Sequence, residues 1–146
     1  MAKSSFAAAA PFDFAALLGI RASNLNELLR AIARGIPFEA IERLQRAIGL
    51  ELDEVAALVQ IPSRTLRRRR TEGRFAPEES DRLVTAARVL SRVLDLFHGD
   101  AAAARTWLTE PQIAFGGAVP IELARTETGA REVENLIGRI EHGVFS

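Results

Sequence analysis

The chain has 146 residues with 19 basic and 19 acidic side chains, so its formal net charge is zero. It contains no cysteine, which excludes a disulfide scaffold, a thiolate metal site and a cysteine nucleophile. Apolar residues make up 48% and charged residues 26% of the chain, proportions typical of a soluble globular protein and not of a disordered one.

Residues 1–12 are expected to form a flexible arm, because they contain one lysine and a short alanine run and no helical pattern. They lack the leucine-rich stretch of a secretory signal. The chain also has no run of about 18 apolar residues, the length that crosses a membrane. We therefore expect a cytoplasmic protein with no membrane partner.

Two amphipathic helices are predicted before residue 50. In the first, apolar residues recur at helical spacing: Leu25, Leu28, Leu29 and Ile32. Ser23 fits the N-cap of this helix and Gly35 its end. Pro37 fits the first position of the second helix, and Gly49 closes it. Its apolar positions are Phe38, Ile41, Leu44 and Ile48. The apolar positions of the first helix are also a candidate surface for a homodimer.

Residues 52–70 have the pattern of a DNA-binding helix-turn-helix, in which a short helix, a tight turn and a second helix follow one another. The first helix would pack through Leu52, Val55, Ala56 and Val59. Ile61 would fill the turn and Leu66 would anchor the second helix. Ser63 would cap that helix, and Gly73 would end it. Gln60 replaces the glycine that is usual in such a turn.

The zero net charge conceals a basic middle and an acidic end. The net charge is −1 over residues 1–60, +5 over residues 61–92 and −4 over residues 93–146. Arginine displaces counterions from phosphates and can hydrogen-bond guanine. The basic second helix therefore predicts a DNA interface, made of Ser63, Arg64 and Arg68 near base edges and Arg67, Arg70 and Arg74 near phosphates, together with Thr65. The alternative is that the arginine run forms only a solvated helix face.

The rest of the chain is also helical in pattern, so the predicted fold class is all-α. Pro77 opens the longest helix, whose apolar face is Leu83, Ala86, Ala87, Leu90, Val93, Leu94 and Phe97. Asp100 caps a helix over residues 101–108, Gly116-Gly117 predicts a turn, and Pro120 opens a short helix. The last helix has an apolar stripe of Val133, Leu136, Ile137 and Ile140. This stripe is expected to pack on Trp107, Leu108 and Leu123.

No group of residues has the pattern of a catalytic, cofactor or metal site. Gly116-Gly117 lacks the glycine spacing of a phosphate loop. His98 and His142 fit helix ends, where they make a poor metal site. The acid pairs Glu78/Glu79 and Glu132/Glu134 fit helix caps or a solvated face. We therefore expect a protein that is not an enzyme and uses neither a cofactor nor a metal.

From Ser63 onward the sequence resembles the Xre/MbcA/ParS-type antitoxins. The matching phrases are Arg64-Thr-Leu-x-Arg68, Glu78-Glu-Ser-Asp-Arg-Leu83, Arg88-Val-Leu90, Ala104-Arg-x-Trp-Leu108 with Pro111, Gly116-Gly-x-x-Pro120, and Thr126-Glu-x-Gly129 followed by Val133, Leu136 and Arg139-Ile-Glu-x-Gly143. They keep their order and spacing over more than half of the chain. After the flexible arm expected at residues 1–12, the resemblance implies an Xre-like helix-turn-helix region for DNA binding and dimerisation at 13–97, and a toxin-binding domain at 98–146.

The resemblance also implies a function, that of an antitoxin in a type II toxin–antitoxin pair. Such a protein binds a RES-domain toxin that consumes NAD⁺ and occludes its active site. It binds operator DNA as a homodimer, represses its own operon and has no catalytic activity. The alternative is a solitary helix-turn-helix regulator or partition-type protein without a toxin partner.

The expected toxin-binding residues lie at the C-terminal end: Arg139, Glu141, His142, Gly143, Val144, Phe145 and Ser146. An exposed aromatic ring is costly unless something covers it. A toxin cleft would cover Phe145, and the alternative is that Phe145 folds back onto its own core. The acidic Glu132, Glu134 and Glu141 would complement basic groups around the toxin's substrate site.

Overall fold

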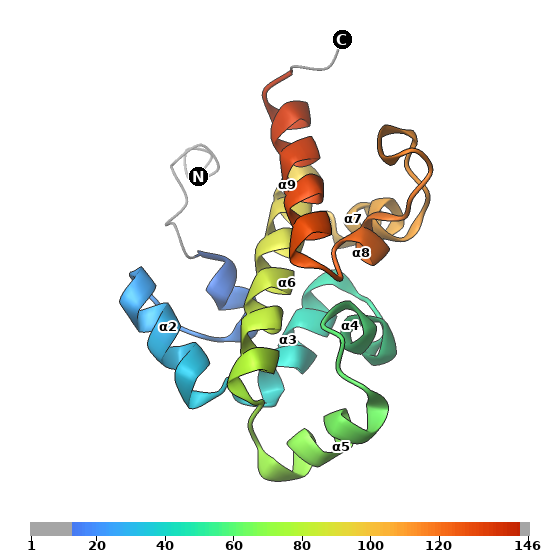
Figure 1. Ribbon diagram of the computed structural model, residues 1–146. Helices are drawn as coiled ribbons and strands as arrows, with labels where there is room; N and C mark the ends of the chain where they lie inside the picture. Colours follow the sequence, from blue (N-terminus) through green and yellow to red (C-terminus); the bar gives the residue numbers. More distant parts are fainter. Residues whose placement is uncertain (1–12, 144–146) are drawn as a thin grey trace.

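The computed structural model describes residues 13–143, and every regular element in that range is a helix (Figure 1). In chain order the elements are η1 (Asp13–Leu18), α2 (Leu25–Arg34), α3 (Glu39–Ile48), α4 (Leu52–Leu58), α5 (Ser63–Glu72), α6 (Pro77–Leu96), α7 (Ala101–Thr109), η2 (Ile113–Phe115), α8 (Pro120–Leu123) and α9 (Glu127–Glu141). The predicted all-α class is confirmed. The expected arm at 1–12 lies outside the described residues.

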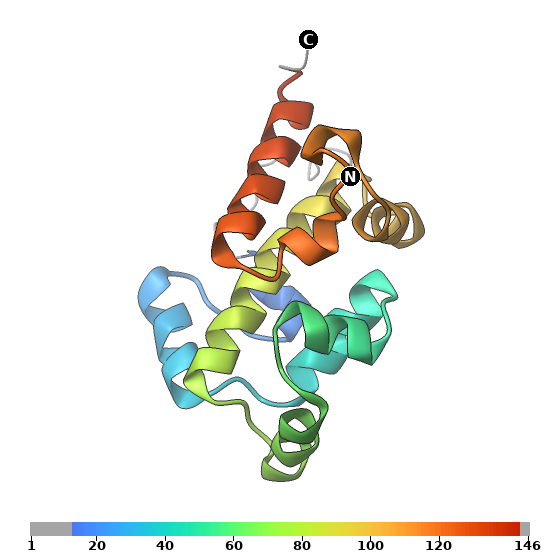
Figure 2. The same cartoon turned by 45° about the vertical axis from the view of Figure 1, so that its right-hand side comes forward.

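The long helix α6 is the centre of the fold. It packs against η1, α2, α3, α7 and α9, so helices from both halves of the chain surround it (Figures 1 and 2). The predicted apolar face is buried from Leu83 to Val93, and Leu94 and Phe97 are half-buried. One hydrophobic core therefore runs from the N-terminal helices to α9. None of the helices among residues 13–143 has the length and hydropathy that a membrane span requires.

Three predicted helix starts are wrong by one or two residues. The N-cap of α2 is Asn24 and not Ser23: the Asn24 side chain accepts a hydrogen bond of 2.9 Å from the Glu27 N–H. Ser63 is the first residue of α5 and makes no capping bond, because Pro62 holds the extended backbone before it. Pro37 pairs with Arg74 in an isolated bridge, so α3 begins later, at Glu39.

The C-terminal helix α9 packs mainly along α6 and also against α8. The expectation that its apolar stripe packs on Trp107, Leu108 and Leu123 omitted α6, the main partner, but Leu123 lies in α8, which does pack against α9. Trp107 lies between two other rings, with centroid distances of 6.3 Å to Phe97 and 6.3 Å to Phe115. The stripe itself is buried at Val133, Leu136 and Ile137, as predicted.

Candidate functional site

The helix-turn-helix consists of α4, a turn and α5. Val55, Ala56 and Ile61 are buried and Leu66 anchors α5, as the spacing predicts. Gln60 has a positive φ of 57°, the left-handed conformation that glycine adopts without steric cost. The replacement of the usual glycine by glutamine therefore leaves the geometry of the turn in place.

The turn is held by side chains from distant parts of the chain. Arg82 of α6 donates a 2.6 Å hydrogen bond from Nε to the carbonyl of Val59. The Gln60 side chain donates from Nε2 to the carbonyl of Arg125, in the segment between α8 and α9. Sequence reasoning missed these contacts, because nothing in the helical spacing relates these residues.

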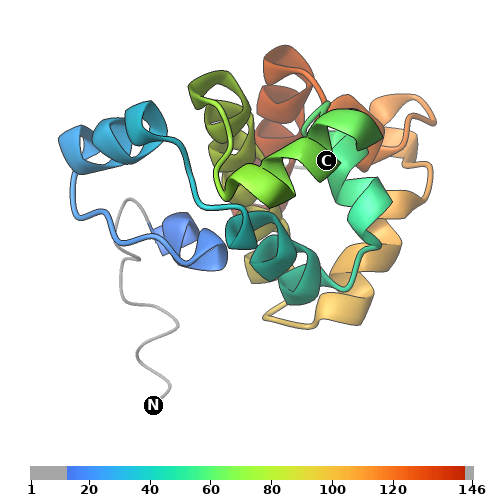
Figure 3. The ribbon, with the colours of Figure 1, turned by 90° about the horizontal axis from the view of Figure 1, so that it is seen from below.

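Helix α5 lies at one end of the molecule, and Figure 3 views the molecule from that end. Ser63, Arg64, Arg67 and Arg68 are exposed on it, and Thr65 is half-buried. Arg68 lies 3.9 Å from Glu72, a weak surface pair. The structure thus brings most of the predicted DNA-binding residues together on the outward side of one helix.

Arg70 and Arg74 also contact the linker between α2 and α3. The Arg70 guanidinium lies 5.1 Å from the Phe38 ring centroid and 3.7 Å from Glu42. Arg74 donates a 2.6 Å bond from Nη1 to the Gly35 carbonyl. Both arginines are exposed as well. They therefore fix the C-terminal end of α5 to the body while presenting positive charge beside it.

Arg69 differs from its neighbours in the arginine run, because it faces the protein. It donates bonds of 2.7 Å and 3.0 Å to the two carboxylate oxygens of Glu79, and a third of 2.9 Å to Glu72. The predicted DNA interface left Arg69 out, but sequence reasoning gave Arg69 no role in anchoring α5. The available signal was its position three residues after the buried Leu66, which places both on one helix face.

Glu79 is 8% exposed at the start of α6 and completes this anchor for α5. It also accepts a 2.8 Å bond from the Ala76 N–H. Burial acts to raise the pKa of the Glu79 carboxyl, but the hydrogen bonds from Arg69 and Ala76 and the nearby positive charge outweigh it, so the pKa lies below its usual value. Glu79 is therefore ionised at neutral pH and holds Arg69 by charge as well as by geometry.

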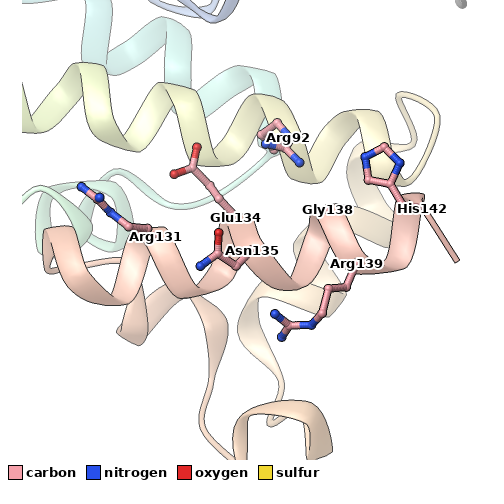
Figure 4. Close-up of a pocket in the computed structure, with 7 residues that line it drawn as sticks. All are labelled: Arg92, Arg131, Glu134, Asn135, Gly138, Arg139 and His142. Carbon is pink, nitrogen blue, oxygen red and sulfur yellow. The ribbon is translucent and has the colours of Figure 1, made fainter. Parts of the chain in front are cut away.

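The predicted toxin-binding residues that the structure describes lie at the C-terminal end of α9. Arg139, Glu141, His142 and Gly143 are exposed there. Arg139 and His142 line a shallow hollow beside α6, whose other lining residues are Arg92, Arg131, Glu134, Asn135 and Gly138 (Figure 4). Val144, Phe145 and Ser146 lie outside the described residues.

Two of the three acidic residues expected to face a toxin are already paired within the chain. Glu134 accepts bonds of 2.8 Å and 3.1 Å from Arg88, and Glu141 accepts one of 3.2 Å from Arg92. The two bonds from Arg88 compensate the charge of Glu134, whereas the more exposed pair of Glu141 with Arg92 is a weak surface interaction. Glu132 remains exposed on α9.

The described residues contain no group of three or more histidine, aspartate or glutamate side chains placed to hold a metal ion. The two candidate surfaces lie apart: the basic helix α5 is at one end of α6 and the C-terminal end of α9 is at the other (Figure 1).

Comparison with known proteins gives matches over both regions. Residues 27–88 match the antitoxin Xre-like helix-turn-helix domain, and residues 92–143 match the antitoxin Xre/MbcA/ParS C-terminal toxin-binding domain. The chain is 43% identical over 130 residues to a protein called Antitoxin Xre from Yersinia enterocolitica, and 32% identical over 130 residues to one of the same name from Photorhabdus laumondii. Each alignment covers 88% of both chains. A third Antitoxin Xre, from Pseudomonas putida, is 33% identical over 84 residues, 57% of this chain and 52% of its own.

Proposed function

The chain belongs to the Xre/MbcA/ParS family of antitoxins, which bind toxins and are not enzymes, and we propose that its partner is a RES-domain toxin that consumes NAD⁺. In this proposal the antitoxin occludes the toxin's active site. It also binds its own operator DNA and represses the operon. The two activities use opposite ends of α6.

Operator binding is supported by the exposed arginines of α5. Arg64, Arg67 and Arg68 point away from the core while Arg69 holds the helix in place. A helix fixed in this way presents guanidinium groups to a DNA groove without first having to be ordered. Ser63 and Thr65 at the start of α5 complete the proposed base-reading surface, with Arg70 and Arg74 at phosphates. Operator binding also assigns the protein to the cytoplasm, where the chromosome lies.

The proposed toxin surface is the C-terminal end of α9 with the residues that follow it: Arg139, Glu141, His142, Gly143, Val144, Phe145 and Ser146. The location of these residues in the chain supports this assignment. Arg139, Glu141, His142 and Gly143 are exposed and close the region that matches the toxin-binding domain, and the last three residues of the list follow them directly in the sequence. We place the toxin-binding domain at 98–146 and the DNA-binding region at 13–97, with α6 as the common support.

The protein is further proposed to act as a homodimer. Leu25 and Leu29 are 55% and 51% exposed and lie one turn apart on α2, at the side of the molecule (Figure 1). Large apolar side chains that share an exposed helix face are typical of a protein–protein contact. A second copy of α2 would cover them.

The proposal is tested by expressing the chain together with the toxin gene beside it. Rescue of growth, co-purification of the two proteins and retardation of the promoter DNA are the expected results. A second chain that ends at Gly143 should retard the DNA as before but protect the cells less well. DNA retardation without any toxin partner would show a solitary regulator instead.

A further inference from the structure

The loop between α7 and α8 carries an isoleucine that is almost completely exposed. Ile113 is 97% exposed, more than any other large hydrophobic side chain of residues 13–143. Loop tips usually carry polar residues, because water forms hydrogen bonds with polar side chains and not with apolar ones. A solvated isoleucine at this place therefore needs an explanation.

The composition of the whole loop is unusual in the same way. Residues 111–121 contain no charged side chain, although charged residues make up 26% of the chain. Depletion of charge with retention of apolar groups is typical of the centre of a protein–protein interface. The exposed isoleucine is thus part of a neutral surface segment and not an isolated exception.

Hydrogen bonds fix the shape of this loop. The Gln112 N–H donates to the Ala118 carbonyl at 3.0 Å, and the Gly117 N–H donates to the Gln112 carbonyl at 2.9 Å. The Gln112 side chain donates from Nε2 to the carbonyls of Trp107 and Glu110, at 3.0 Å and 3.2 Å. Gly116 and Gly117 supply the positive φ angles of the turn, 66° and 93°.

An aromatic contact supports the same loop from within. The Phe115 ring packs edge-on against Trp107, whose other neighbour is Phe97 of the α6 end. Ile113 is therefore presented at a fixed position. A loop whose backbone is ordered before binding loses less conformational entropy when it docks.

The position of the loop favours the toxin as its partner. The loop lies within residues 92–143, which match the toxin-binding domain. Figures 1 and 2 both show it at the end of the molecule that carries the C-terminal end of α9, away from α5. A toxin bound at the end of α9 would have this loop beside it.

We propose that residues 111–117 form a second toxin contact, in which Ile113 enters an apolar pocket on the toxin surface. The inference rests on the proposed function, since it requires that the protein binds the RES-domain toxin at the end of α9. Side chains that fill such pockets supply a large share of the binding free energy.

The test compares two variants of the full chain that gain the same charge. Ile113→Asp places a carboxylate in the proposed contact, and Ala102→Asp places one on an exposed position of α7. Affinity is measured by calorimetry against the purified product of the neighbouring toxin gene, in a catalytically inactive form. We expect Ile113→Asp to weaken binding by about 10- to 100-fold, and Ala102→Asp to leave it unchanged.

Two further measurements separate the outcomes. Ile113→Leu should retain most of the affinity, and the melting temperature and operator affinity of Ile113→Asp should equal those of the wild type, because Ile113 is exposed. Equal toxin affinity of Ile113→Asp and the wild type would overturn the second contact alone. Absence of binding by the wild type itself would overturn the proposed toxin partner, and this contact with it.

Discussion

The side chain of Gln60, in the turn of the helix-turn-helix, hydrogen-bonds the backbone carbonyl of Arg125, 65 residues further along the chain. Gln60 belongs to the region that matches the helix-turn-helix domain, and Arg125 to the region that matches the toxin-binding domain. The two regions are therefore in direct polar contact in addition to sharing α6. Arg82 holds the other side of the same turn through the Val59 carbonyl.

Substitutions of Gln60 should separate the cost of the backbone conformation from the loss of this bond. Gln60→Ala and Gln60→Gly both remove the bond to Arg125, but only glycine adopts a φ of 57° without strain. We expect Gln60→Ala to be less stable than Gln60→Gly by about 1 kcal/mol. Urea denaturation measures the difference, and equal stability of the two variants would contradict the strained conformation.

Removal of the outward arginines of α5 should weaken operator binding and leave toxin binding intact. For the pair Arg64→Ala and Arg67→Ala we expect a loss of roughly 1–3 kcal/mol of DNA-binding free energy for each base contact, and a smaller salt dependence for each lost phosphate contact. Gel retardation at several salt concentrations measures both. Arg131→Ala, which removes one positive charge from α9, is the control and should bind DNA normally.

The ion pair between Arg69 and Glu79 should make the docking of α5 sensitive to acid. The pKa of Glu79 is below its usual value of 4.5 in the folded protein, so its stabilising effect is complete above pH 4.5 and is lost as the pH falls through the lowered pKa. Glu79→Gln should lower the melting temperature at pH 7 and flatten its decline between neutral and acidic pH. The exposed neighbour provides the control: Glu78→Gln should retain the wild-type profile.

Two glycines of α9 should respond to alanine in opposite directions. A Cβ atom at Gly129 would lie 1.8 Å from the Leu123 carbonyl oxygen, whereas one at Gly138 would meet only Arg92, at an ordinary 3.7 Å. We expect Gly129→Ala to destabilise the fold by roughly 1–3 kcal/mol and Gly138→Ala to stabilise it by about 0.5–1 kcal/mol. Thermal unfolding of both variants checks the signs, and a stable Gly129→Ala would show that α8 and α9 do not approach so closely.

Polar substitutions on the exposed face of α2 should dissociate the proposed homodimer into monomers. Leu25→Ser with Leu29→Ser removes apolar area from the contact without altering the side of the helix that packs on α6 through Leu28. Sedimentation equilibrium should show a monomer with weaker operator binding, since one half-site is then bound alone. Asn26→Ser, on the same helix, should remain a dimer. A dimeric double variant would rule out this face.

The sequence predicted the helices and the helix-turn-helix well, because these depend on local signals. Gly35, Gly49 and Gly73 end helices as their conformational freedom implies. The prediction of Ser23 as the N-cap was wrong, and Asn24 is the cap. Serine and asparagine have similar capping preferences, so the sequence does not show at which of the two adjacent residues the helix begins.

Other features of the two surfaces depend on tertiary contacts that no spacing encodes. The pairing of Glu134 with Arg88, between residues 46 positions apart, removes an acidic group that looked available in the sequence. The exposure of Ile113 is equally invisible in a pattern of apolar residues, because isoleucine is most often buried. The inward orientation of Arg69 could have been predicted, since Arg69 lies three residues after the buried Leu66 and therefore on the same helix face.

The length of α6 has an electrostatic consequence for the two partners. Its 20 residues correspond to about 30 Å of helix, while charges in water at physiological salt are screened over about 8 Å. In the proposed arrangement, charged groups of a toxin at the end of α9 would therefore exert almost no force on DNA phosphates at α5. Any effect of one partner on the affinity for the other has to pass through atomic contacts such as that of Gln60 with Arg125, and it should persist at high salt while operator affinity itself declines.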